Sequence, residues 1–145
     1  MDTSTFRTNL KTLLDADATL SAAGVVVYKY PPGDTGLRTN APVIGFNEIA
    51  SVGVEDGSLL ASSTSDQTYS IQGGVFVKAT GESDTAWAAA EATANTLIER
   101  IRVVCIENER LSGIATQTRL VAWNLEPTAD NVFTGDFTIL VRVVA

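Results

Sequence analysis

The sequence predicts an α+β fold, in which a mixed, mainly antiparallel sheet is packed by an N-terminal helix and one long amphipathic helix. Apolar residues recur every three or four positions over 4–20 and again over 84–105, as on the buried face of a helix. Apolar and polar residues alternate over 68–79 and 137–144, as in a strand with one buried face. These patterns place two helices against a sheet.

The length and composition of the chain indicate one domain that spans residues 1–145. A chain of 145 residues buries roughly two-thirds of its surface on folding, which suffices for a hydrophobic core. We find no internal repeat and no linker in the sequence. Hydrophobic residues make up 45% of the chain and the mean hydropathy is +0.14. This surplus indicates either apolar surface reserved for partner subunits or a monomer rich in alanine and valine.

The first element is expected to be a helix from Ser4 to Leu20, begun by the side-chain oxygen of Ser4 or Thr5 and ended by Gly24. The next run, Val25–Tyr30, is rich in β-branched and aromatic residues and is apolar on both sides at its start. It predicts an interior strand covered on both faces. Two prolines end this strand, because proline cannot donate to the sheet ladder.

Two polar segments separate this strand from the central part of the chain. The loop Pro31–Pro42 is longer than the usual ~4–6 residues, as functional loops often are. Asp56-Gly57 predicts a two-residue β-hairpin between Ser51–Val54 and Ser58–Ala61. The segment Ser62–Gln67 has no apolar anchor and is expected at an exposed hairpin tip.

The central block is a strand followed by the long helix. Thr68–Ala79 has strand periodicity, and the Gly73-Gly74 pair in its middle predicts a β-bulge or a close backbone contact. Ser83 or Asp84 can cap the helix, which is expected to run to Cys105. Its apolar stripe should hold it against the sheet.

The chain closes with a predicted hairpin. Thr118–Leu125 pairs with Phe133–Val144 across the turn-rich segment 126–131. Trp87 lies on the apolar stripe of the long helix, and Trp123 lies in the first strand of this hairpin. Both indole rings are expected to pack in the core rather than to bind a ligand.

The residue inventory argues against an enzyme. The chain has no histidine, which excludes the Ser-His-Asp and Cys-His arrangements and most zinc sites, because each needs an imidazole. The one cysteine, Cys105, falls on a helical apolar stripe, where it acts as a small hydrophobe and fits a reducing cytosol. No glycine segment has the spacing of a phosphate-binding loop. We therefore expect no catalytic residue, no cofactor and no metal.

Charge and hydropathy limit the classes of partner. Ten Lys and Arg against 17 Asp and Glu give a net charge of −7, which opposes stable binding to a phosphate backbone. An acidic wall past which DNA moves without sticking is compatible with this charge. No apolar run approaches the ~20 residues that a membrane-spanning helix needs. We expect a soluble protein with no membrane partner.

Five segments carry a resemblance to a known family: Phe6–Leu14, Val25–Tyr30, Gly73–Lys78, Trp87–Ile101 and Leu140–Val144. In this order, with the long helix entered through Ser83-Asp84, the chain resembles the tail-terminator proteins of long-tailed bacteriophages. The resemblance covers nearly the whole chain and lies in the succession of elements rather than in a motif.

The resemblance implies a single tail-terminator-like domain and a non-enzymatic ring, typically a hexamer. Such a ring caps the head-proximal end of the tail tube, ends tail polymerisation and joins the tail to the head. The implied partners are the tail tube protein and a head-completion protein, with DNA passing through the lumen without specific binding. The implied location is the virion, after assembly in the host cytoplasm. A head-completion or connector protein is the alternative, and a carboxylate-based enzyme or small-ligand module is a more distant one.

Candidate partner-interface residues are charged and lie in the long loops, at the predicted hairpin or late in the long helix. They are Asp34, Arg38, Glu55, Asp56, Asp66, Arg100 and Arg102. The two helical arginines can pair with Glu99 or Glu107, or can meet an acidic partner surface. We expect subunits to associate through sheet edges and helix faces.

Overall fold

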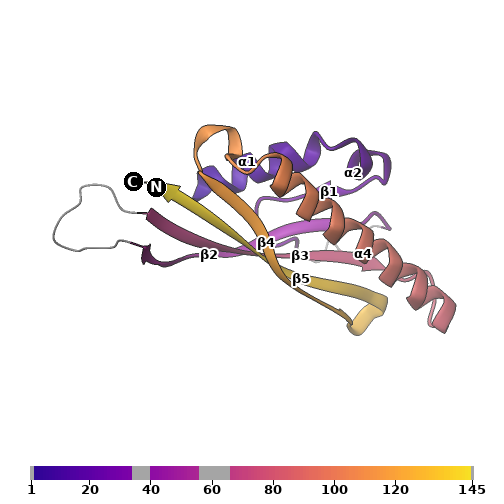
Figure 1. Cartoon of the computed structure of the whole chain (residues 1–145). Helices are drawn as coiled ribbons and strands as arrows, with labels where there is room; N and C mark the ends of the chain where they lie inside the picture. Colours follow the sequence, from indigo (N-terminus) through magenta and orange to yellow (C-terminus); the bar gives the residue numbers. More distant parts are fainter. Residues whose placement is uncertain (1, 34–39, 56–65, 145) are drawn as a thin grey trace.

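The computed structural model describes residues 2–33, 40–55 and 66–144; at 53–55, 66, 129 and 144 it describes the backbone alone. Its centre is a five-stranded sheet in the order β1-β2-β3-β5-β4 (Figure 1). The strands are β1 Val26–Val27, β2 Val43–Glu55, β3 Asp66–Lys78, β4 Gln117–Pro127 and β5 Val132–Val144. Only β1 and β2 are parallel, and every other pair is antiparallel. The predicted α+β class with a mainly antiparallel sheet is confirmed.

Helices lie on one side of the sheet. They are α1 Thr3–Asp15, α2 Ala18–Ala22 and α4 Asp84–Glu107, and Figure 1 shows all three above the strands. Side chains alternate accordingly: Ile71 of β3 and its β5 partner Ile139 face the helices and are 0% exposed, whereas Gln72, the next residue of β3, is exposed. The core therefore sits between the helices and one face of the sheet, and the other face is polar.

The long helix α4 forms as predicted. Ser83 caps it, because its Oγ accepts the backbone N–H of Ala86 at 3.2 Å. The buried side chains are those of the predicted stripe, namely Ala90, Ala94, Leu97, Ile98, Ile101, Val104 and Cys105. Trp87 is half-buried and packs against the edge of this core. Alanines within the stripe allow the 24-residue helix to lie close to three strands, β3, β4 and β5.

The predicted single helix from Ser4 to Leu20 is wrong in its continuity and in its start. Asp2, rather than Ser4 or Thr5, caps α1, with its carboxylate accepting the Ser4 N–H at 2.9 Å. The helix ends at Asp15, and a second short helix begins after Asp17. The break leaves Leu20 in the core, as its spacing in the sequence predicted, and its side chain is 1% exposed.

The prediction of an interior strand over Val25–Tyr30 is also wrong. Only Val26–Val27 is a strand, and it forms an edge of the sheet beside β2. Val27 is buried, but Val26, Tyr28 and Tyr30 are exposed by 38%, 36% and 56%. β-branched and aromatic composition indicates extended backbone, but it does not separate an edge strand from a central one.

The strand partner predicted for Ser51–Val54 is wrong, and the predicted turn Asp56-Gly57 lies outside the described residues. Residues of β2 that were expected to pair with Ser58–Ala61 pair instead with β3, as Ser51 does with Tyr69 and Val54 with Gln67. The connection between β2 and β3, including the predicted loop Ser62–Gln67 up to residue 65, lies outside the described residues. The turn residues alone predicted the wrong pairing partner for β2, because the apolar alternation of β3 determines which segment pairs with β2.

The closing hairpin and the close contact at Gly73 are confirmed. β4 pairs with β5 from Gln117 opposite Arg142 to Pro127 opposite Phe133. A Cβ placed on Gly73 would lie 2.5 Å from the ring of Phe137, its partner in β5. The ring thus occupies the space that a side chain at Gly73 would need.

Candidate interaction surfaces

The charged residues predicted to face partners fall into three sets: three outside the described residues, two at one end of the sheet and two on α4. Asp34, Arg38 and Asp56 lie outside the described residues. Glu55 and Asp66 are backbone partners at the end of the β2–β3 pair, so they share one end of the sheet. Their role in partner binding stays a prediction.

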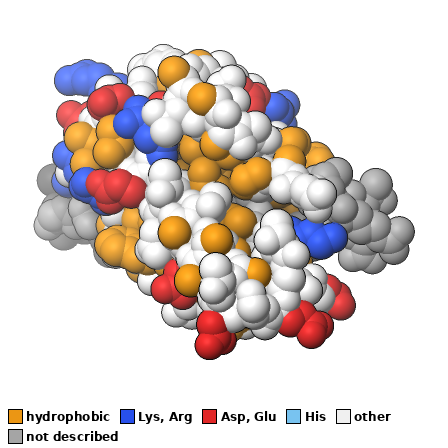
Figure 2. Space-filling model, turned by 90° about the vertical axis from the view of Figure 1, so that its right-hand side faces the viewer, with side chains coloured by type: hydrophobic (Ala, Val, Ile, Leu, Met, Phe, Trp, Pro, Cys, Tyr) orange, Lys and Arg blue, Asp and Glu red, His pale blue; other side chains and the backbone are white. Residues whose placement is uncertain are grey.

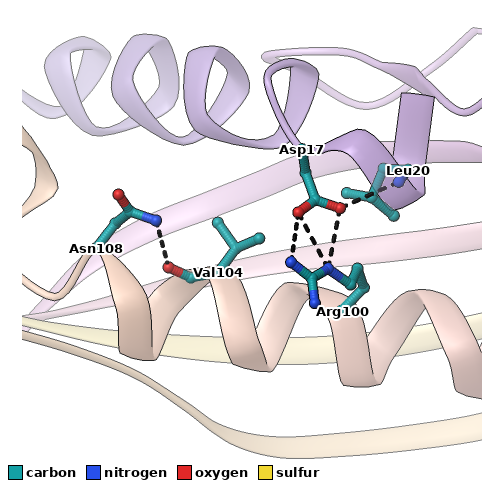
Figure 3. Close-up of polar contacts among 5 residues, drawn as sticks. All are labelled: Asp17, Leu20, Arg100, Val104 and Asn108. Atoms are coloured by element: carbon teal, nitrogen blue, oxygen red, sulfur yellow. Dashed lines mark hydrogen bonds and ion pairs between the residues drawn. The ribbon is translucent and has the colours of Figure 1, made fainter. Parts of the chain in front are cut away.

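Arg100 is engaged within the chain, in a contact that the sequence did not indicate. Its guanidinium donates to both carboxylate oxygens of Asp17, with Nη2 at 2.6 Å from Oδ1 and Nε at 3.0 Å from each oxygen (Figure 3). The Asp17 side chain is 8% exposed and that of Arg100 is 28% exposed. Asp17 also accepts the N–H of Leu20 at 3.1 Å. The pair joins the α1–α2 junction to the middle of α4.

These contacts perturb the protonation of both groups in the direction expected for an ion pair. Hydrogen bonds from Arg100 hold the pKa of the Asp17 carboxyl below its ordinary value, against the opposing effect of burial. The same hydrogen bonds raise the pKa of the Arg100 guanidinium. Both groups therefore remain charged at neutral pH, and their function in the isolated chain is to fix helix α2 to helix α4.

Arg102 has the helical partner that its spacing indicated. It donates to Glu99 through Nε at 3.0 Å and Nη2 at 2.6 Å, and this contact lowers the pKa of Glu99. The side chains of Arg102 and Glu99 are 40% and 60% exposed, so the pair stands on the surface of α4. The helix ends one turn later, where the Asn108 side chain donates to the Val104 carbonyl at 2.9 Å (Figure 3).

One edge of the sheet is β4, whose one partner among the described strands is β5. Val121 and Trp123 on this strand are 49% and 53% exposed. The prediction that Trp123 lies in the core is therefore wrong, because alternation in sequence cannot show that a strand has a neighbour on one side only. The register shifts between Leu120 and Ala122, which places Val121 in a β-bulge.

The opposite edge is formed by β1 and, beyond it, by β2. Its exposed apolar side chains are Val26, Tyr28, Tyr30 and Val52. Arg7 of α1 covers part of this edge. Its guanidinium donates to the carbonyl oxygens of Lys29, at 2.8 Å, of Phe46, at 3.0 Å, and of Asn47, and lies 4.5 Å from the centre of the Tyr30 ring.

Two hollows lie on the sheet face away from the helices. One, of about 410 Å³, is lined mainly by polar residues that include Asn47, Gln72 and Asp136. A smaller one, of about 240 Å³, lies beside Val121 and Leu140.

A third hollow, of about 600 Å³, lies between the first half of α4 and the β4–β5 turn. Trp87 and Phe133 form its apolar floor, with ring centres 6.3 Å apart, and Asp84 and Glu91 are among its lining residues. Figure 2 views the molecule from this end and shows apolar side chains near the centre and acidic side chains near the lower margin. Acidic side chains therefore lie below the apolar ones at this end (Figure 2).

The described residues contain no arrangement suited to metal binding. Within residues 2–33, 40–55 and 66–144, no three acidic or cysteine side chains gather as ligands. Cys105 is buried, which raises the pKa of its thiol to about 12 and makes it unreactive at neutral pH. None of the described helices combines the length and the apolar character needed to cross a bilayer.

Comparison with known proteins shows a similarity of fold. No protein-family model matches the chain, and no curated protein matches it. Among solved structures, the chain is similar to a component of the virion of a native gene transfer agent particle. The alignment covers 96% of this chain and 94% of that one, with a TM-score of 0.57 and 13% sequence identity. The two chains thus share their fold over nearly their whole lengths.

Proposed function

We propose that the protein is a non-enzymatic structural component of a phage-like virion, and that it acts as the tail terminator. In this role it forms a ring, most simply a hexamer, at the head-proximal end of the tail tube. The ring ends tube polymerisation and joins the tail to a head-completion protein, with DNA passing through its lumen. The observation that carries the proposal is the shared fold with a virion component over nearly the full length of both chains.

Two features of the structure support an assembly role. Apolar side chains are exposed at both edges of the sheet, including Trp123 on β4 and Tyr30 beside β1. Exposed apolar surface of this kind marks sites of protein–protein contact. The second feature is that the two exposed apolar edges lie on opposite sides of one sheet, so both can be covered at once in an assembly.

The role can be tested by deleting the gene for this protein and examining the particles that assemble without it. We expect micrographs of such particles to show overlong tails, or tails of normal form that are not attached to heads. Restoring the wild-type chain should restore joined particles. Heads that leak DNA beside tails of normal length would instead assign the chain to head completion, and particles of normal yield and form would refute both roles.

The loop residues give a more local test of the same proposal. Replacing Asp34 and Arg38 together with alanine should lower the yield of joined particles while the purified protein keeps its circular dichroism spectrum. Asp15→Ala is a matched control, because Asp15 is an exposed charged residue on α1 whose described ion pair is with Lys11. A normal yield from the loop variant would remove this loop from the joining surface.

A further inference from the structure

We infer that copies of this chain join head to tail, with the β4 edge of one copy packing against the β1–β2 edge of the next. The inference rests on the proposed function, since a ring needs two different surfaces that recognise each other. It commits to a second copy of the same chain as the partner and to apolar and aromatic side chains as the main contact.

The β4 edge is only partly protected: it has a bulge at Val121 and a proline at its end, Pro127, but apolar side chains in its middle. Soluble proteins commonly place lysine, proline or an inward-pointing charge at such an edge. Here the middle of the strand presents Val121 and Trp123, about half of each being exposed. The bulge at Val121 turns an apolar side chain outward rather than a charged one. An edge of this composition is expected to be covered in the assembled protein.

The β1–β2 edge has the same character. Among the described residues β1 pairs with β2 only at Val43 and Ile44, so no described strand pairs with β2 on that side over the rest of its length. Tyr28, Tyr30 and Val52 are exposed here, and Val52 lies at a second bulge, between Ser51 and Gly53.

Backbone pairing alone does not explain how these edges meet. Arg7 already donates hydrogen bonds to the carbonyl oxygens of Phe46 and Asn47. The bulges at Val52 in β2 and Val121 in β4 also make the backbone of each edge strand irregular. A continuous strand-to-strand ladder between copies is therefore blocked at these positions. The contact depends instead on side chains, which favours stacking of aromatic rings over added hydrogen bonds.

The register of the sheet places the two apolar edges at the same level. One cross-strand row runs from Val26 through Val43, Phe76 and Thr134 to Glu126. The chain continues from Val26 to Tyr28 and Lys29 at one edge, and from Glu126 back to Trp123 at the other. A second copy set beside the first in the plane of the sheet therefore brings Trp123 against the segment that contains Tyr28 and Tyr30.

Charge supports this pairing. Lys29 is exposed at the β1 edge, and Glu126 is exposed at the β4 edge. Neither has an ion pair within the described part of the chain. A lysine at one edge and a glutamate at the other give the two edges opposite charges, which favours contact between different edges of two copies.

The arrangement is heterologous, because each contact joins two different surfaces, the β4 edge and the β1–β2 edge, which lie on opposite sides of the sheet. Each copy uses one edge and leaves the other free, so addition continues until a ring closes or a filament forms. A two-fold dimer would use the same edge twice and would leave the other edge exposed.

Side-chain substitution tests the surface. At one protein concentration, with and without isolated tail tubes, native mass measurement should give an oligomer for the wild-type chain and a monomer for Trp123→Lys and for Tyr28→Glu. Ile106→Lys is the control, since Ile106 is 43% exposed on α4 and belongs to neither edge. Its oligomer should persist. A wild-type oligomer that survives both edge substitutions overturns the inference and leaves the proposed function standing.

Cysteine crosslinking tests the arrangement. Copies that carry both Tyr28→Cys and Trp123→Cys should oxidise to a ladder of covalent oligomers, and copies with Trp123→Cys alone should not crosslink. The native Cys105 is buried and does not interfere. Crosslinking of the single variant shows a β4–β4 contact and overturns the head-to-tail arrangement. A wild-type chain that stays monomeric, with and without tubes, refutes both the inference and the proposed ring.

Discussion

Asp17 has two structural roles at the junction of α1 and α2. Its carboxylate caps the short helix α2 by accepting a hydrogen bond from the Leu20 N–H. The same carboxylate accepts hydrogen bonds from two nitrogens of Arg100. The first role is local and typical of aspartate. The second joins residues that are 83 positions apart in the sequence, and no periodicity can reveal it.

Replacing Asp17 with asparagine separates these roles, because asparagine keeps a capping oxygen but loses the negative charge. We expect the free energy of unfolding to fall by about 1 kcal/mol at pH 7, a modest value because Arg100 is partly exposed and screened by solvent. Urea unfolding followed by circular dichroism measures the change. Asp15→Asn, which removes only the exposed pair with Lys11, should change stability by less than about 0.5 kcal/mol.

The pH dependence of the same variant has a definite sign. The folded pKa of Asp17 lies below the unfolded value, so its stabilisation is present above the unfolded value of about 4. It is lost as the pH falls through the folded pKa. The stabilities of the wild-type chain and Asp17→Asn should therefore converge in acid, and a constant difference from pH 7 to pH 3 would contradict the ion-pair assignment.

At the scale of elements, Gly73 and Phe137 show how β3 and β5 fit together. The two residues are cross-strand partners, and the Phe137 ring lies over the glycine and meets Phe46 edge-on, with ring centres 5.9 Å apart. An aromatic ring that covers a glycine on the neighbouring strand restores the apolar surface that glycine lacks. Gly73 is thus required for close approach in the core.

Gly73→Ala should destabilise the protein by about 1–3 kcal/mol, the usual cost of overpacking. The new Cβ would lie 2.5 Å from a ring that is itself 2% exposed and has no room to move. Thermal unfolding measures the loss. Gly74→Ala is the matched control: its Cβ would meet the half-buried Phe76 ring at 2.9 Å, and that ring can move toward solvent. Equal losses in the two variants would contradict this account.

The elements also show what the sequence could and could not predict. The cap, stripe and length of α4 follow from local spacing, and the structure confirms them within two residues at the C-terminal end. Val25–Tyr30 and Trp123 have the composition of core strands but lie at the sheet edges. Strand order is set by pairing between distant segments, which composition does not encode. The same limit applies to the arginine ion pairs. Glu99 is one helical turn from Arg102, so that pair follows from local spacing, whereas Asp17 is remote in sequence from Arg100.

At the scale of the whole molecule, Cys105 provides a measure of folding. It is the only cysteine, it lies on the buried face of α4 and is 2% exposed, and burial raises its thiol pKa to about 12. We expect a thiol reagent to modify the folded protein only through unfolding, and to modify it at once in denaturant. Labelling followed by mass measurement checks this expectation. Rapid labelling of the folded chain would show that α4 opens locally.

The same measurement supports the assembly tests. An edge variant such as Trp123→Lys should lose its oligomer but keep the slow labelling of Cys105, because β4 exposes Trp123 without using it in the core. Fast labelling of this variant would mean that the substitution unfolds the chain. The oligomer result would then be taken from Tyr28→Glu and from the cysteine crosslinks.

The position of β3 between β2 and β5 has a consequence for the order of folding. β2 with β3 and β4 with β5 are each hairpins of neighbouring segments, whereas β3 and β5 are separated in sequence by the whole of α4. We expect the β3–β5 pairing to form after the two hairpins, because it closes the longest stretch of chain and so has the largest single loop-closure cost in the sheet. Until that pairing is complete each hairpin carries an additional unpaired strand, so newly synthesised chains are most prone to exchange strands with one another at the β3–β5 seam.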